Sequence, residues 1–209
     1  MYRGRSVGIV IPAYNEAGFV GDVIETVPEY ADRVYVVDDC STDDTWNEIQ
    51  RHAREVNEAS EIAVMDGGAA SEAGQSVAGG KNPSGGRKFE QRVVPIQHEQ
   101  NRGVGGAIKT GYEHAREDEI EITSVMGGDG QMDPEILDRL LDPIVEDRAD
   151  YVKGNRLLDP ADREEMPTFR LIGNGILSVL TKIASGYWKI GDPQNGYTAI
   201  STRALERLD

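Results

Sequence analysis

Two short, mostly apolar runs near the start of the chain most constrain its fold. Residues 7–11 and 33–37 have the length and composition of strands buried on both faces, and Pro12 is expected to end the first. Helical spacing of apolar residues follows each run, over 17–27 and 44–56. This strand–helix–strand–helix order predicts a parallel sheet covered by helices.

The same alternation continues in the second half of the chain. Strands are expected over 93–97, 121–126 and 151–153, and helices over 105–116 and 134–147. We therefore predict a single α/β domain with a mostly parallel sheet, spanning residues 1–209.

A segment poor in large apolar side chains separates the two halves. Residues 67–86 are rich in Gly, Ala and Ser, so we expect 57–91 to be a disordered insertion loop, with a lid over a donor site as the alternative. Residues 202–209 look like a helix that has just begun. We therefore expect the C-terminal part of the protein to be missing.

Composition limits the possible partners and the compartment. The 37 acidic against 22 basic residues give a net charge of −15, which excludes a nucleic-acid partner and fits a solvated, even halophilic, surface. A single cysteine, Cys40, permits no intrachain disulfide and fits a reducing cytoplasm. The mostly apolar residues 171–184 contain too many polar and glycine residues to span a bilayer, although they suit a membrane surface.

Polar motifs follow the predicted strands, and in open α/β sheets ligands bind at that edge. After the first strand, Tyr14 and Glu16 suit stacking on and hydrogen bonding to a nucleoside; a helix N-terminus is the structural alternative. After the second, Asp38 and Asp39 suit the imino proton of uracil or guanine, while Ser41 and neighbouring acids suit helix capping.

Two glycine-rich stretches suit phosphate groups. In 127–135 (GGDGQMDPE), small residues let a diphosphate approach, Asp129 offers a hard oxygen ligand for Mg²⁺ or Mn²⁺, and Gln131 adds a carbonyl oxygen; a bare turn is the alternative. Residues 101–107 (NRGVGGA) resemble a phosphate loop before a helix. They are not the dinucleotide fingerprint, because its third glycine would fall on Ile108.

Six motifs occur in one order: PAYNE, VDDCSTDDT, NRGVGGAIKTG, GGDGQMDPE, GNR and DPQNGYTAIS. In this order the chain resembles family 2 glycosyltransferases of the GT-A fold, and most of all the branch with dolichol-phosphate mannosyltransferase and related polyprenyl-phosphate sugar transferases. The resemblance covers residues 6–205 apart from 57–91.

The resemblance implies site residues, grouped here by role. The nucleoside would be held by Pro12, Tyr14 and Glu16, the base by Val37 and Asp39, the donor diphosphate by Gly128 and Asp129, and the metal by Asp129 and Gln131. The acceptor side would hold the arginines Arg156 and Arg170 and the candidate base Asp192. One departure is clear: the first acid of the family's Asp-x-Asp-x-Gln motif is Gly127 here, which weakens the metal assignment.

The implied reaction is an inverting transfer from a GDP- or UDP-sugar to a dolichol or polyprenyl phosphate, for protein or cell-surface glycosylation. Partners would be the nucleotide-sugar, the lipid phosphate and the cytoplasmic face of the membrane. A first alternative is a glycan or lipid-linked sugar hydroxyl as acceptor, with Asp192 as the required base. A second, suggested by Gly127, is a nucleotide-binding protein that has lost catalysis.

The remaining candidate residues receive no chemical role. The three histidines show no metal-ligand spacing, and His52 and His114 are expected on the surface of helices. Cys40 is likewise assigned no chemistry. A nucleotidyltransferase is disfavoured, because it usually needs a glycine-rich basic loop directly after the first strand.

Overall fold

The computed structural model describes residues 1–67, 89–154 and 195–207, with the side chains of 61–67 left out, and five single positions between 177 and 186. The strands are β1 (Val7–Ala13), β2 (Arg33–Asp38), β3 (Val93–Gln97), β4 (Ile122–Val125), β5 (Tyr151–Lys153) and β6 (Thr198–Ser201). The helices are α1 (Val20–Thr26), α2 (Thr45–Gly67), α3 (Gly103–Glu117), the 3-10 turn η1 (Pro134–Ile136), α4 (Leu137–Val145) and α7 (Thr202–Leu205).

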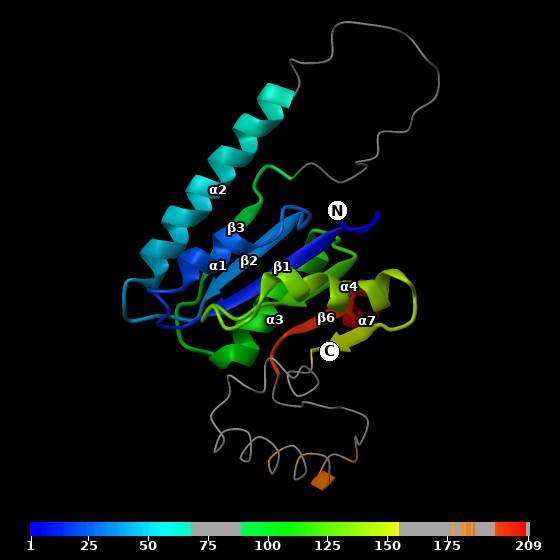
Figure 1. Ribbon diagram of the computed structural model, residues 1–209. Helices are drawn as coiled ribbons and strands as arrows, with labels where there is room; N and C mark the ends of the chain where they lie inside the picture. The colour runs from blue at the N-terminus through cyan, green and yellow to red at the C-terminus, as the bar shows by residue number, and fades with distance from the viewer. Residues whose placement is uncertain are drawn as a thin grey trace, which may run out of the picture.

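The strands form one six-stranded sheet in the order β3-β2-β1-β4-β6-β5, and Figure 1 labels four of them, β3, β2, β1 and β6. The pairs β1–β2, β2–β3 and β1–β4 are parallel, whereas β6 runs antiparallel to both β4 and β5. The predicted α/β fold with a mostly parallel sheet flanked by helices is confirmed.

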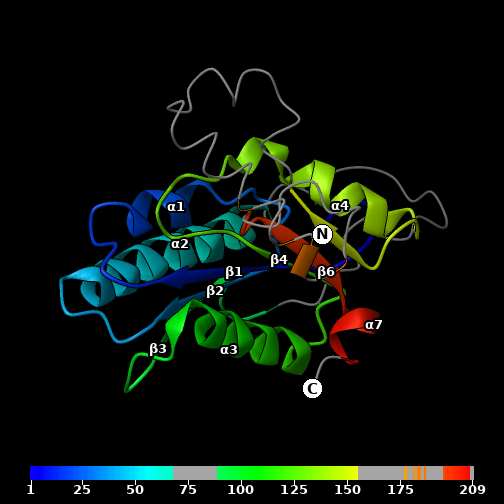
Figure 2. The same cartoon turned by 90° about the horizontal axis from the view of Figure 1, so that it is seen from below.

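Alternate side chains of the central strands fill two cores. Val7, Ile9 and Ile11 of β1 point into the larger core, with apolar residues of α1, α2 and α4, while Val10 of β1 points into the smaller core, with apolar residues of α3. Figure 2 shows the same division, with α1, α2 and α4 on one face of the sheet and α3 on the other. Burial on both faces explains why these strands are continuous apolar runs.

The strand register brings the carboxyl ends of the parallel strands to one edge of the sheet. Ala13 pairs with Asp38, and Asp38 pairs with Gln97. Beyond the strands, the Asp39 N–H donates to Ala13 O at 2.9 Å, and the Gly128 N–H donates to Pro12 O at 3.3 Å. The loops after β1, β2, β3 and β4 are therefore neighbours, and this edge carries the candidate site.

Several predicted boundaries need correction. Strand β1 continues through Pro12 to Ala13, since a proline near a strand end removes one donor where β4 has already finished. Helix α1 begins at Val20 rather than at 17. Strand β6 was not predicted, because it has only four residues and it pairs with β4, a strand far from it in the sequence.

The prediction that residues 57–67 belong to a disordered loop is wrong. Helix α2 continues to Gly67, so residues 57–67 are helical, in keeping with the strong helix formers Ala, Glu and Met in that stretch. Asn57 anchors the helix: its side chain donates to Val93 O at 2.9 Å and accepts the N–H groups of Arg92 and Val93. Residues 68–88 lie outside the described part of the chain.

The last described element is a short helix that follows β6. The helix expected from residue 202 forms as the four-residue α7, with the Ser201 side chain accepting the Ala204 N–H as its cap. Within the described residues, the structure contains no helix with the length and apolar character that crossing a membrane requires.

Candidate functional site

The loop after β1 is tied to the loop after β2. Asn15 and Cys40 both adopt positive φ angles, of 56° and 62°. The Asn15 side chain accepts the Thr42 N–H at 2.8 Å, while its own N–H donates to Ser41 Oγ at 2.9 Å. These reciprocal bonds join the two loops. Ser41 therefore does not cap the next helix as expected, and the neighbouring acid Asp43 accepts the Thr45 N–H at 3.1 Å instead.

This junction presents Tyr14 and Glu16 at the edge of the sheet. Tyr14 is 47% exposed, so its ring is available for stacking on a ligand. The Glu16 N–H donates to Thr45 Oγ1 at 2.7 Å, which fixes the residue. Burial, together with the charges of Asp129 and Asp43, raises the pKa of the Glu16 carboxyl. Glu16 and Asp129, distant in sequence, therefore belong to one acidic site.

Two adjacent acids lie at the end of β2, Asp38 as its last residue and Asp39 directly after it, and they have different partners. Asp38 is fully buried, and its carboxylate accepts the Ser41 N–H at 3.1 Å and Gln97 Nε2–H at 3.0 Å. Asp39 is 2% exposed, and its Oδ1 accepts His98 Nδ1–H at 2.7 Å and the Arg102 N–H at 2.8 Å. Both carboxylates thus accept hydrogen bonds, which offset the free-energy cost of burying their charge.

The sequence did not reveal the role of His98. The histidine lies just past β3, is 6% exposed, and places Nε2 2.9 Å from Thr110 Oγ1 of α3. Although burial opposes ionisation, the Arg102 N–H and the His98 ring hold the pKa of Asp39 below its usual value. A buried hydrogen-bond chain therefore links the ends of β2 and β3 to α3.

The loop after β4 lies against the end of β1. A Cβ on the buried Gly128 would come 3.0 Å from Pro12 O and 3.3 Å from Ala13 Cβ, so a glycine allows this close approach. Asp129 is partly exposed, and its Oδ1 accepts the Gln131 N–H at 3.1 Å. Gln131 itself is exposed. The structure therefore brings Asp129 and Gln131 into one turn beside Pro12.

Val37 differs from the other predicted nucleoside residues. Its side chain is fully buried within the sheet, where it pairs with Pro12 and Ile96. Only its main chain lies near the strand ends. A contact from Val37 to a base would therefore involve backbone atoms.

Parts of the predicted acceptor side reach the same edge. Strand β6 begins where β4 ends, since Thr198 pairs with Val125, and the Gly154 N–H donates to Tyr197 O at 2.9 Å. A Cβ on Gly196 would lie 3.2 Å from Met132 Cε of the β4 loop. The candidate residues Arg156, Arg170 and Asp192, and most of 171–184, lie outside the described residues.

A second titratable cluster lies between α1 and α2. Glu25, His52 and Glu55 offer ligand atoms within 4.8 Å of one another. The expectation of a surface His52 is wrong: it is 8% exposed and packs on Gly21, where a Cβ would come 2.2 Å from its ring. The side chain of His114, by contrast, is 41% exposed, as expected.

The hydrogen bonds of His52 explain this cluster as a bridge between helices. Arg51, which can only donate, lies 2.7 Å from His52 Nε2, so Nδ1 carries the proton that is donated to Glu25 at 2.6 Å. A metal on Nδ1 would have to displace that proton and break the Arg51 contact. We therefore interpret the cluster as a hydrogen-bonded contact between α1 and α2.

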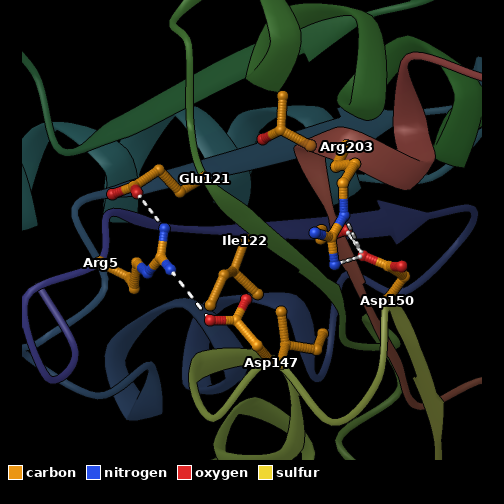
Figure 3. Close-up of a pocket in the computed structure, with 9 residues that line it drawn as sticks. Arg5, Glu121, Ile122, Asp147, Asp150 and Arg203 are labelled. Atoms are coloured by element: carbon orange, nitrogen blue, oxygen red, sulfur yellow. Dashed lines mark hydrogen bonds and ion pairs between the residues drawn. The ribbon is translucent and has the colours of Figure 1, made fainter.

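A cavity of about 280 Å³ lies at the opposite end of the sheet (Figure 3). Its charged walls are already paired: Arg5 contacts Glu121 at 2.9 Å and Asp147 at 3.9 Å, and Arg203 contacts Asp150 at 2.7 Å. Glu121 precedes β4, whereas the loop that carries Asp129 follows β4. The cavity is therefore separate from the candidate site.

The sequence model of Glycosyl transferase family 2 matches residues 8–209. The chain is a family 2 glycosyltransferase. It is 31% identical over 205 residues to the UDP-N-acetylglucosamine–dolichyl-phosphate N-acetylglucosaminyltransferase of Methanococcus voltae, covering 98% of this chain and 72% of that protein. An uncharacterised protein of Methanocaldococcus jannaschii is 27% identical over 201 residues, covering 96% and 66%.

Solved glycosyltransferase structures share the fold of this family 2 glycosyltransferase. A mannosyltransferase from Pyrobaculum calidifontis, in complex with GDP-Man and Mn²⁺, has a TM-score of 0.56 at 18% identity, with 98% of this chain and 46% of that chain covered. Glucosyl-3-phosphoglycerate synthase from Mycobacterium tuberculosis, with Mn²⁺, UDP and its product, has a TM-score of 0.53 at 18% identity, with 95% and 57% covered. The chain thus spans about half the length of these two proteins.

Proposed function

We propose that this glycosyltransferase moves a sugar, with inversion at the anomeric carbon, from a GDP- or UDP-sugar to a dolichol or polyprenyl phosphate. One observation carries the proposal: the loops after β1, β2 and β4 meet at one edge of the sheet, with Glu16, Asp39 and Asp129 among them. The 31% identical dolichyl-phosphate sugar transferase supports the choice of acceptor.

The nucleoside site uses the loops after β1 and β2. Pro12 and the exposed ring of Tyr14 provide the apolar wall, and Glu16 accepts hydrogen bonds from the ribose hydroxyls. Asp39 and the backbone at Val37 meet the base. The junction between the loops makes this wall rigid before the donor arrives, which lowers the ordering cost of binding.

The β4 loop suits the donor diphosphate and a divalent ion. Gly128 lets the diphosphate approach the backbone, and the carboxylate of Asp129 with the amide oxygen of Gln131 provides the hard oxygen ligands that Mg²⁺ and Mn²⁺ prefer. Burial, and after it the neighbouring charges of Asp129 and Asp43, raises the pKa of Glu16, and a cation bound here would lower the cost of ionising it. When bound, the ion neutralises charge on the leaving diphosphate.

The transfer needs no base when the acceptor is a phosphate. An anionic oxygen of the lipid phosphate attacks the anomeric carbon from the face opposite the nucleotide. The bond from that carbon to the diphosphate oxygen breaks, and a nucleoside diphosphate leaves with the bonding pair. Arg156 and Arg170 are the proposed contacts of the acceptor phosphate.

A hydroxyl acceptor is the second candidate, favoured by the acid in the motif DPQNGY. A hydroxyl must lose its proton during attack, which requires a carboxylate such as Asp192. Asp192→Asn separates the two candidates: with a phosphate acceptor, kcat should change by less than about tenfold, whereas loss of a general base costs about 10²–10⁴-fold. Asp192→Glu, which keeps the carboxylate, is the matched control.

The direct experiment offers the full-length protein a panel of radiolabelled GDP- and UDP-sugars with dolichyl phosphate. Residues 171–184 suggest membrane association, which vesicle flotation tests. The net charge of −15 suggests adaptation to high salt, which activity assays in molar KCl test. A labelled lipid that requires both the donor and the phosphate supports the proposal. Transfer to free glycans or dolichol-linked sugars, but not to the lipid phosphate, would contradict it.

A further inference from the structure

The two acids at the end of β2 use their carboxylate oxygens differently. Asp38 is fully buried and has a donor on each oxygen, the Ser41 N–H on Oδ1 at 3.1 Å and Gln97 Nε2–H on Oδ2 at 3.0 Å. Both oxygens of Asp38 are therefore bound within the protein, as is usual for a buried structural carboxylate. Asp39, the next residue, does not follow this pattern.

The hydrogen bonds of Asp39 are concentrated on one of its two oxygens. Oδ1 accepts His98 Nδ1–H at 2.7 Å and the Arg102 N–H at 2.8 Å. The Gly103 N–H donates to Asn101 Oδ1 at 3.0 Å instead. Among the described residues, neither of the two bonds to Asp39 falls on Oδ2, although the side chain is only 3% exposed. A nearly buried acceptor without a donor is costly, so Oδ2 is suited to an N–H group of a ligand.

The side chain of His98 is held on both sides of the imidazole ring. A carboxylate can only accept, so Nδ1 carries the proton donated to Asp39, and Nε2 lies 2.9 Å from Thr110 Oγ1 of α3. The His98 main-chain N–H donates to Asp38 O at 2.9 Å, which fixes the backbone as well. The ring therefore has one orientation, and through Oδ1 it sets the direction in which Oδ2 of Asp39 points.

We propose that His98 is a positioning residue for the nucleotide: by holding Oδ1 of Asp39, it directs Oδ2 toward an N–H group of the base. The inference rests on the proposed function, in which Asp39 meets the base. His98 itself touches no ligand and acts only through Asp39. Uracil and guanine both carry an imino N–H, so this role is the same for either base.

Asp39→Asn tests the division between the two oxygens. The asparagine Oδ1 can keep its bonds to His98 and Arg102, because both partners are donors, and the amide nitrogen then takes the place of Oδ2. That nitrogen cannot accept an N–H from a base. We expect Tm to fall by no more than about 4 °C, while the affinity of the full-length protein for UDP or GDP, measured by calorimetry, falls about tenfold or more.

Two substitutions of His98 test whether it acts through Asp39. His98→Asn puts an N–H donor near the position of Nδ1 and so keeps the bond to Asp39, while His98→Gln puts it near Nε2, toward Thr110. Both variants remove the ring, so loss of packing is common to both. His98→Gln should weaken nucleotide binding about tenfold and His98→Asn by no more than about threefold. In the Asp39→Asn background, His98→Gln should weaken binding by less than about a further twofold.

Three outcomes would overturn the inference, each in a protein that still binds UDP or GDP. They are equal weakening by His98→Gln and His98→Asn, a His98→Gln effect as large in the Asp39→Asn background as in the wild type, and unchanged affinity in Asp39→Asn. If Asp39→Asn does not fold, the comparison of the two His98 variants decides alone. A wild type that binds neither nucleotide would refute the proposed function itself, and the inference with it.

Discussion

Replacing Gly127 by aspartate tests whether Asp129 is a metal ligand. A Cβ built on Gly127 would lie 3.0 Å from Asp129 Oδ1 and 3.5 Å from Met132 Cε. Both neighbours are the ends of side chains, which can rotate away. Gly127→Asp therefore places a second carboxylate next to Asp129 without moving the backbone.

The electrostatic effect depends on whether a cation is bound. Two unit charges about 4 Å apart repel by about 1 kcal/mol in water and about 4 kcal/mol at an effective dielectric constant of about 20. Gly127 and Asp129 are both partly exposed, so we expect the metal-free protein to lose about 1 kcal/mol of stability. With a divalent ion, the added ligand should tighten binding about 10- to 100-fold, or about 1.4–2.7 kcal/mol.

The assay titrates Mn²⁺ into the purified protein and follows the free ion by electron spin resonance. Gly127→Asn has the same shape without the charge, so its dissociation constant should stay within about threefold of wild type. If Gly127→Asp folds and binds Mn²⁺ no more tightly, Asp129 is not a ligand. The double variant Gly127→Asp/Asp129→Ala should lose most of the gain; a retained gain would refute the same assignment.

Two further predictions concern stability. Burial and two neighbouring carboxylates raise the pKa of Glu16, so the folded state holds this proton more tightly and stability falls as pH rises from the ordinary pKa through the raised one. Glu16→Gln should therefore raise Tm at pH 7 but not at pH below the ordinary pKa, and a lower Tm at pH 7 would contradict this. In α3, a Cβ on Gly111 would lie 2.3 Å from Val10 Cγ1, so Gly111→Ala should cost about 1–3 kcal/mol in urea unfolding. Gly105→Ala meets no atom within 4 Å and should gain about 0.4–1 kcal/mol; equal effects would refute the close contact.

The sequence predicts the parallel part of the fold well, because its strands are buried on both faces. Continuous apolar runs and helical periodicity locate β1 to β4 and the helices between them. Strand β6 escapes prediction because its four residues owe their conformation to pairing with β4, about 75 residues earlier in the chain. The extension of α2 to Gly67 is not predicted, because the Gly-, Ala- and Ser-rich residues 67–86 indicate a loop whose start was placed at residue 57.

The meeting of the strand-end motifs is predicted from the sequence for a clear physical reason. Motifs at strand ends identify Glu16, Asp39 and Asp129, and the parallel register places all three at one edge. The role of His98 is missed because its partners, Asp39 and Thr110, lie 59 and 12 residues away. Its position directly after a strand that neighbours β2 was the signal available in the sequence.

Transfer of labelled sugar from a UDP-sugar to dolichyl phosphate, with and without Mn²⁺, tests the central claim most directly. The wild type should form the labelled lipid phosphate and lose activity when the metal is chelated. Asp129→Ala should lower turnover at saturating donor by about 10²-fold or more, with UDP still bound through the loops after β1 and β2. Equal metal-dependent turnover by Asp129→Ala and wild type, or labelled product with no dependence on the lipid phosphate, would contradict the proposal.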